Sequence, residues 1–180
     1  LLAVSWFAHR ENLSFWKIAD FVALLAPLAT FFGRLGNVFN VELDGATTEP
    51  PWGMVLPDLF PLGALRHPST LYEAFLEGIV LFAVLLWWRR KMSFPGAPAS
   101  NAVSVAPAGW LSCLYMAGYA VLRFVAEFFR SPDPQIGVFF TALHGGLTLG
   151  QLFSVLMLCV AAVLFVWLKH RNRVTIGQKA

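Results

Sequence analysis

Four long apolar stretches separated by polar segments dominate this chain of 180 residues. They cover residues 18–36, 70–88, 109–129 and 149–168, and none alternates apolar and polar positions as a half-buried strand does. A transmembrane helix needs about 20 apolar residues to cross the hydrocarbon core, so each stretch has the length of one span. Backbone groups in lipid must be hydrogen-bonded within their own segment, which favours helices. The pattern predicts an all-α, polytopic transmembrane helix bundle, organised as a single membrane domain over residues 1–180.

A further apolar run occupies residues 1–8, before the first full stretch. No basic segment or small-residue cleavage site frames it as a signal peptide. We interpret this run as the end of a preceding span, and the chain as truncated at its amino terminus. The alternative is a simple trimmed start.

Composition agrees with a membrane protein. Hydrophobic residues make up 58% of the chain and charged residues only 13%, whereas about 25% of a soluble globular domain is charged. So apolar a chain is not intrinsically disordered. Its two cysteines, Cys113 and Cys159, are too few for a disulfide scaffold and are expected to be small buried hydrophobes within spans.

The basic residues predict an orientation. Successive spans cross the membrane in opposite directions, so the segments between them alternate between its two faces. This arrangement places nine of the thirteen Lys and Arg residues on one face: Arg10, Lys17, Arg89, Arg90, Lys91, Lys169, Arg171, Arg173 and Lys179. By the positive-inside rule this face is cytoplasmic. Residues 37–69 and 130–148 are then outward loops, and residues 169–180 form a cytoplasmic tail. The positive net charge of +3 thus reflects topology and indicates no nucleic-acid partner.

Four arginines do not follow this rule, and all lie near the predicted outward ends of spans: Arg34, Arg66, Arg123 and Arg130. A charged side chain inside the bilayer costs about 2.5–3.5 kcal/mol on insertion scales, so it is retained for a partner or a ligand. Tyr119, Arg123 and Glu127 are spaced four residues apart and form a polar stripe on one helix face. We expect this stripe to face the bundle interior. A pair between Arg123 and Glu127 that only neutralises charge is the alternative.

Arg34 lies in the segment Gly33-Arg-Leu-Gly-Asn37, where Arg34 and Asn37 share a helix face. Gly33 and Gly36 are expected to permit close backbone approach between helices, with Arg34 reaching the membrane surface. Alternatively, the guanidinium and the amide form an anion site, because Arg binds phosphate oxygens bidentately. Lipid headgroups are the phosphates available at that depth.

The segment Arg66-His-Pro-Ser-Thr-Leu-Tyr-Glu73 is typical of a helix start, with Ser69 as a possible N-cap. Glu73 and Glu77 then project along one side of the helix. Capping explains Ser69 and Glu73 but not the entry of His67 and two carboxylates into one membrane helix. Arg66 and Arg130 lie at the edges of predicted loops. They could have a functional role, or they could only form local ion pairs and extend their charged ends to the membrane surface.

Three motifs occur here in one order: Gly33-Arg-Leu-Gly-Asn37, Arg66-His-Pro-Ser-x-Leu-Tyr-Glu73, and Gly118-Tyr-x-x-x-Arg-x-x-x-Glu-Phe-Phe-Arg-x-Pro-Asp133. Together with Gly150-Gln151 they resemble the phosphatidylglycerol:prolipoprotein diacylglyceryl transferase family over essentially the whole chain. The resemblance implies a bacterial inner-membrane protein of seven spans, of which these would be the last four, with the active side facing outward.

The same resemblance implies transfer of diacylglycerol from phosphatidylglycerol to the lipobox cysteine of a preprolipoprotein signal peptide. The sequence shows no metal-ligand spacing, phosphate-binding Gly-rich loop or Ser-His-Asp pattern, so we expect no metal and no cofactor. The resemblance implies Arg34 and Arg123 as catalytic residues. The substrate-binding residues would be Arg34, Asn37, Glu42, Gly45, His67, Glu73, Tyr119, Glu127 and Arg130. Glu77 would support the site.

The family's catalytic histidine belongs to a His-Gly-Gly motif that precedes Gly33. His144-Gly145-Gly146 has the same letters but follows the Arg-x-Pro-Asp motif, so we interpret it as an ordinary outward loop. The 180 residues alone are therefore expected to be inactive. A transporter subunit, which should show internal repeats, and a non-catalytic anionic-lipid-binding membrane protein are the rival functions.

Overall fold

The structure, a computed structural model, describes residues 2–41, 45–49, 51–55, 63–92, 107–131, 138–139 and 146–177. The helices are α1 (Leu2–Arg10), α2 (Phe15–Phe39), α3 (Ser69–Glu73), the π-helix η1 (Ala74–Val80), α4 (Leu81–Met92), α5 (Trp110–Ala126), the 3₁₀ helix η2 (Glu127–Phe129) and α6 (Leu149–Gly177). The strands are β1 (Met54–Val55), β2 (Leu65–Arg66), β3 (Val138–Phe139) and β4 (Leu147–Thr148).

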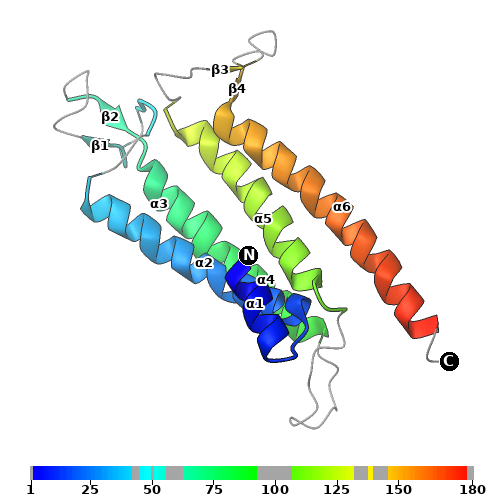
Figure 1. Cartoon of the computed structure of the whole chain (residues 1–180). Coiled ribbons are helices and arrows are strands. Elements are labelled where there is room, and N and C mark those ends of the chain that lie inside the picture. Colours follow the sequence, from blue (N-terminus) through cyan, green and yellow to red (C-terminus); the bar gives the residue numbers. More distant parts are fainter. Residues whose placement is uncertain are drawn as a thin grey trace.

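Four helices are long and apolar enough to cross a membrane, and they are Phe15–Phe39, Ser69–Lys91, Trp110–Phe129 and Leu149–Arg171. The second of them consists of α3, η1 and α4, which follow one another without a break. This confirms the predicted all-α, polytopic helix bundle. Two small antiparallel sheets, β1–β2 and β3–β4, were not predicted. Both lie at the same end of the bundle (Figure 1).

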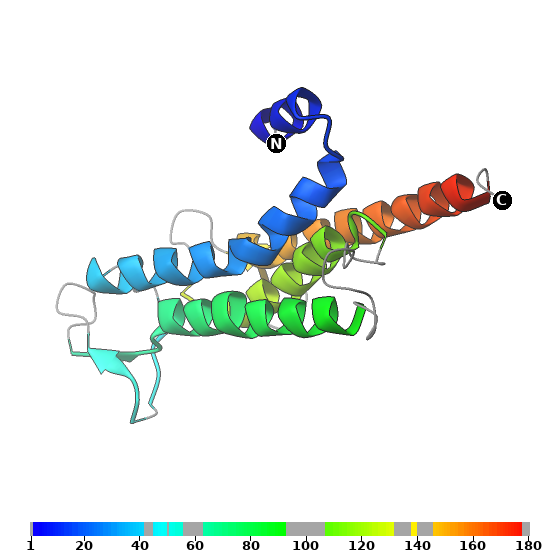
Figure 2. The same cartoon turned by 90° about the horizontal axis from the view of Figure 1, so that it is seen from below.

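The helices pack as a layer in which α2 contacts both η1 and α5, and α6 lies along α5. Figure 2 shows α1 turned away from these four helices. The apolar core consists of Leu24, Leu81 and Leu85, which the side chains of Tyr115 and Tyr119 partly cover. Many large apolar side chains of α6 stay exposed, as is typical of helices that are apolar on all sides and face lipid.

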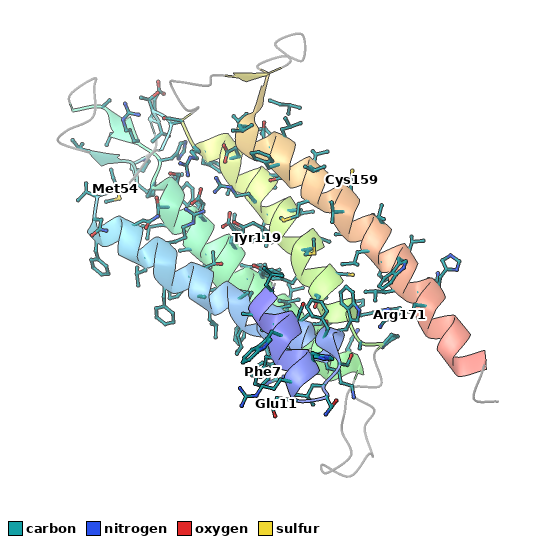
Figure 3. All side chains as sticks on the ribbon, viewed as in Figure 1. Phe7, Glu11, Met54, Tyr119, Cys159 and Arg171 are labelled. Carbon is teal, nitrogen blue, oxygen red and sulfur yellow. The ribbon has the colours of Figure 1, made fainter. Side chains whose placement is uncertain are left out.

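Cys113 is buried as expected, but the expectation for Cys159 is wrong, because this residue is exposed. It lies on α6, whose main packing partner among the described helices is α5 (Figure 3). The N-cap prediction is also wrong by one position. Pro68 is the N-cap, with φ −73° and ψ 64°, and Ser69 is the first helical residue.

Close helix approach occurs at a different glycine from those expected. No described atom lies within 4 Å of the position of a Cβ on Gly33 or Gly36, so the expectation for these two residues is wrong. At Gly78 an added Cβ would lie 2.6 Å from the Cβ of Phe31 and 3.1 Å from its Cα. Gly78 therefore sets the distance between η1 and α2.

A carboxylate on α2 holds the start of α5. Asp20 Oδ2 accepts the Gly109 backbone N–H at 2.7 Å, and Oδ1 accepts the Ser112 backbone N–H at 2.8 Å and the Ser112 hydroxyl at 2.7 Å. The first N–H groups of a helix have no partner within the helix, so Asp20 supplies from another helix the acceptor that an N-cap side chain normally provides. Local sequence patterns do not predict this role of Asp20, because the contact spans about 90 residues of chain.

We predict that Gly78→Ala destabilises the protein by about 1–3 kcal/mol, since the new methyl group must displace the α2 backbone. Gly33→Ala is the matched control, because it adds the same methyl group to open space and improves helix propensity by up to about 1 kcal/mol. Thermal unfolding in detergent measures both. Equal melting temperatures of the two variants would contradict the packing role of Gly78.

We also predict that Asp20→Ala lowers the free energy of unfolding by about 1–3 kcal/mol, because it leaves buried N–H donors unpaired. The control is Glu11→Ala, which removes an exposed ion pair with Arg10 (3.4 Å) worth about 0–1 kcal/mol. The same unfolding measurement should show the larger loss for Asp20→Ala. A loss no larger than that of Glu11→Ala would refute the capping role.

Candidate functional site

A single buried carboxylate gathers three arginines from separate parts of the chain. Glu73, at the end of α3, is 1% exposed. Its Oε2 lies 3.0 Å from Arg34 Nε of α2, and its Oε1 accepts a hydrogen bond from Arg123 Nη1 of α5. Arg130 Nη1, just after η2, lies 3.5 Å from the same Oε1. Glu73 thus joins three of the four arginines that depart from the positive-inside pattern.

Arg123 also bonds along its own helix. Its Nη2 lies 3.0 Å from Glu127 Oε2, the pair that the spacing of four residues predicted. The Thr148 hydroxyl donates to Glu127 Oε1 at 3.0 Å. A Cβ on Gly150 would lie 2.6 Å from Glu127 Cδ. The start of α6 therefore needs a glycine at this position to admit the carboxylate that holds Arg123.

Glu77 completes the set of charges. Its side chain is 0% exposed and lies one helical turn beyond Glu73, within η1. Its oxygens are 3.6 Å from Arg123 Nη1 and 3.8 Å from Arg34 Nη2. A π-helix is rare and is found mostly at functional sites. The widened helix here carries a carboxylate directly beneath the arginines.

The arginines, unlike the carboxylates, are partly accessible. The side chains of Arg34, Arg123 and Arg130 are 23%, 16% and 31% exposed, against 1% for Glu73. Buried carboxylates bind guanidinium nitrogens of Arg34 and Arg123, while these side chains remain partly exposed. Guanidinium groups bind phosphate and carboxylate through two parallel hydrogen bonds. The arrangement is suited to an anion that approaches from the outer side of the cluster.

Arg66 is used differently from the other three arginines. It is buried, so it does not reach to the surface, and its Nη1 donates to the Gly45 carbonyl at 3.1 Å. The Ser131 hydroxyl donates to the same carbonyl at 2.9 Å. Gly45 itself lies against the backbone of His67, where a Cβ would be 1.7 Å from the carbonyl oxygen. The structure places Arg66 and Gly45 in a loop layer beside the cluster, where they join three segments of the chain.

His67 belongs to an aromatic group in the same layer. Its Nδ1 lies 3.3 Å from the Tyr72 hydroxyl, which also accepts the Trp52 indole N–H at 3.0 Å. The rings of His67 and Tyr72 each meet Phe129 edge to face, with centroids 5.3 Å apart. Because Phe129 directly precedes Arg130, this group supports the outer edge of the arginine cluster.

The remaining candidates are placed as follows. Asn37 is half-buried one turn beyond Arg34 on α2. Tyr119 lies inside the bundle (Figure 3), with its ring 6.1 Å from that of Tyr115. Glu42 and His144 lie outside the described residues. The structure therefore brings Arg34, Glu73, Glu77, Arg123, Glu127 and Arg130 into one cluster, with Gly45 and His67 beside it.

Comparison with known proteins gives a consistent result. A family model described as prolipoprotein diacylglyceryl transferase matches residues 1–167. A phosphatidylglycerol--prolipoprotein diacylglyceryl transferase of Wolinella succinogenes is 44% identical over 173 residues, which are 96% of this chain and 56% of the relative. Proteins of the same name from Vibrio campbellii (40% identical, 96% of this chain, 56% of the relative) and Idiomarina loihiensis (41%, 95% and 57%) are also similar.

The chain spans about half the length of the curated relatives it matches. The match covers all four helices that can cross a membrane, except the last residues of α6. It also includes every residue of the arginine and glutamate cluster. With this extent and identity, the chain belongs to the prolipoprotein diacylglyceryl transferase family and is a multi-pass membrane protein.

Proposed function

We propose that this chain carries the phospholipid-binding part of an enzyme that transfers the diacylglyceryl group of phosphatidylglycerol to the lipobox cysteine of a preprolipoprotein. The observation that carries the proposal is the set of partly exposed arginine side chains, Arg34, Arg123 and Arg130, around the buried Glu73. The names of the relatives give phosphatidylglycerol and a prolipoprotein as their substrates, and the lipobox cysteine as acceptor is part of the proposal.

In the proposed reaction the cysteine Sγ attacks the diacylglyceryl carbon that carries the phosphate ester. A C–S bond forms while the C–O bond to the phosphate breaks, and the thiol proton leaves with glycerol phosphate. Negative charge builds on the phosphate oxygens in the transition state, so fixed positive charges in a water-poor site lower the barrier. In this proposal Arg34 and Arg123 supply these charges, and Arg130 extends the cluster toward the loops.

The carboxylates position the arginines. Arg123 Nη1 donates to Glu73 and Nη2 faces Glu127, so both ends of the guanidinium are fixed from different elements. A pre-oriented donor needs no reorganisation when charge develops, which is the source of its catalytic effect. In this proposal Asn37, Glu42, Gly45, His67 and Tyr119 bind or border the headgroup.

We further propose that the protein lies in the bacterial inner membrane with the cluster on the periplasmic side. The opposite end of the bundle carries most of the basic residues, several of them stacked on tryptophans. Lys91 Nζ lies 4.2 Å from the Trp87 ring centroid, and the Arg171 guanidinium lies 5.1 Å from that of Trp167. Such aromatic and basic groups are typical of the cytoplasmic membrane interface.

The test is transfer of labelled diacylglycerol from phosphatidylglycerol to a lipobox peptide. The assay uses a chimera in which the 173 aligned residues of this chain replace those of the Wolinella succinogenes relative. Transfer by the chimera is the expected result. A chimera that folds and binds phosphatidylglycerol but leaves the thiol unmodified would favour a non-catalytic lipid-binding protein instead.

We predict that Arg123→Lys in this chimera lowers the transfer rate about 10²–10³-fold, because an ammonium group cannot bond Glu73 and Glu127 while facing a phosphate. Arg90→Lys, at the opposite end of the bundle, is the matched control and should transfer at the parental rate. Unchanged turnover in Arg123→Lys would remove the role assigned to this residue.

A further inference from the structure

The first turn of α6 begins with a capping box formed by Thr148 and Gln151. The Gln151 backbone N–H donates to Thr148 Oγ1 at 3.2 Å, and the Thr148 backbone N–H donates to Gln151 Oε1 at 3.1 Å. The helix itself starts at the next residue, Leu149. The first N–H groups of a helix have no partner within it, so this reciprocal pair of bonds stabilises the start of α6 and fixes the Thr148 side chain.

The same hydroxyl bonds Glu127, which follows α5 in the chain. A threonine hydroxyl donates one hydrogen bond and has two lone pairs that accept. Because Thr148 Oγ1 accepts the Gln151 N–H, its own proton is available, and it is donated to Glu127 Oε1 at 3.0 Å. The other carboxylate oxygen, Oε2, lies 3.0 Å from Arg123 Nη2. The contacts therefore run without a break from Gln151 through Thr148 and Glu127 to Arg123.

The start of α6 is built to receive the Glu127 carboxylate, and it lies beside the end of α5 (Figure 1). A Cβ on Gly150 would lie 2.6 Å from Glu127 Oε1 and 2.7 Å from Oε2, so the carboxylate lies directly against the first turn. The amino-terminal end of a helix carries a partial positive charge, which stabilises a carboxylate there. Glu127 and Gln151 are both buried, so water does not readily replace a hydrogen bond lost between these residues.

We propose that Thr148 is a positioning residue for diacylglyceryl transfer, which orients Glu127 and, through Glu127, the guanidinium of Arg123. The inference rests on the proposed function, in which Arg123 stabilises the charge on the departing phosphate. One oxygen of Glu127 faces Arg123 and the other accepts the Thr148 hydroxyl, so this bond fixes the rotation of the carboxylate. Without the hydroxyl the carboxylate can rotate, and Arg123 loses a fixed partner.

A role confined to helix capping is the alternative, and two substitutions of Thr148 distinguish the roles. Serine, threonine and aspartate all cap helices well, but an ionised aspartate has no proton to donate. Thr148→Asp therefore keeps the capping acceptor and removes the donor to Glu127. Thr148→Ser keeps both. If Thr148 only caps α6, both variants should retain transfer, whereas the positioning role is retained in Thr148→Ser alone.

The transfer assay with the chimera tests this difference. We expect Thr148→Val and Thr148→Asp to lower kcat on the order of tenfold, since a small displacement of a catalytic group is costly. KM for phosphatidylglycerol should change less, because Arg34 and Arg130 still bind the phosphate in the ground state. Thr148→Ser should transfer within about threefold of the parental chimera, as the two hydroxyls are similar caps and donors. Parental kcat in Thr148→Asp would overturn the proposal.

Ser154→Ala is the matched control on the same helix. Ser154 is buried and its hydroxyl donates to the Gly150 carbonyl at 2.8 Å, within α6. Removing this hydroxyl perturbs the same turns of α6 without touching Glu127, so kcat should stay at the parental value. A loss of kcat in Ser154→Ala as large as that in Thr148→Val would assign the effect to general disturbance of α6 and contradict the proposal.

Solid-state NMR of the chain in bilayers supplies a readout that does not depend on transfer. Dipolar couplings between ¹³C-labelled glutamate carboxyl groups and ¹⁵N-labelled arginine side chains report the pair of Glu127 and Arg123, assigned by its loss in Arg123→Lys. We expect this coupling to persist in Thr148→Ser and to weaken in Thr148→Val. An unchanged coupling in Thr148→Val would overturn the proposal even if no variant transfers lipid.

The two measurements separate this inference from the proposed function. If the parental chimera transfers no diacylglycerol, the proposed function fails and the role of Thr148 in transfer fails with it, while the NMR coupling still decides whether Thr148 orients Arg123. If the parental chimera transfers diacylglycerol and Thr148→Val and Thr148→Asp transfer it equally fast, the inference fails and the proposed function stands.

Discussion

The buried ion pairs around Glu73 are the interactions on which the rest of the site depends. A carboxylate that is 1% exposed draws Arg34, Arg123 and Arg130 to one point between α2, α3 and α5. Removing one partner from such a group is costly, because an uncompensated charge then remains in the apolar interior. The ion pairs that fix the arginines therefore also fix the positions of α2, α3 and α5 relative to one another.

The surrounding structure fits this requirement. Gly78 brings η1 within contact distance of α2, and Gly150 leaves room for the carboxylate of Glu127. The loop layer formed by Gly45, Arg66 and Ser131 closes over the same end of the bundle. At the far end, Asp20 holds the start of α5 on α2. The helices are thus held together at both ends, and α3, which carries Glu73, begins at the end of the bundle with the small sheets (Figure 1).

The helices and part of the cluster could be predicted from the sequence, because both depend on local spacing. Apolar length identified the four helices, and the separation of four residues identified the pair Arg123–Glu127. Partners distant in sequence could not be assigned in this way: Glu73 lies 50 residues from Arg123. For the same reason local spacing predicted a close glycine contact at Gly33 and Gly36 rather than at Gly78, and it did not predict the buried role of Arg66.

The central claim is that the cluster binds the phosphate of an anionic phospholipid. Solid-state NMR of the chain in phosphatidylglycerol bilayers tests it most directly, through dipolar couplings between the lipid phosphorus and ¹⁵N-labelled guanidinium nitrogens. The account predicts couplings to Arg34 and Arg123, assigned by their loss in the corresponding lysine variants. Couplings confined to arginines at the opposite end of the bundle, such as Arg89 and Arg90, would contradict it.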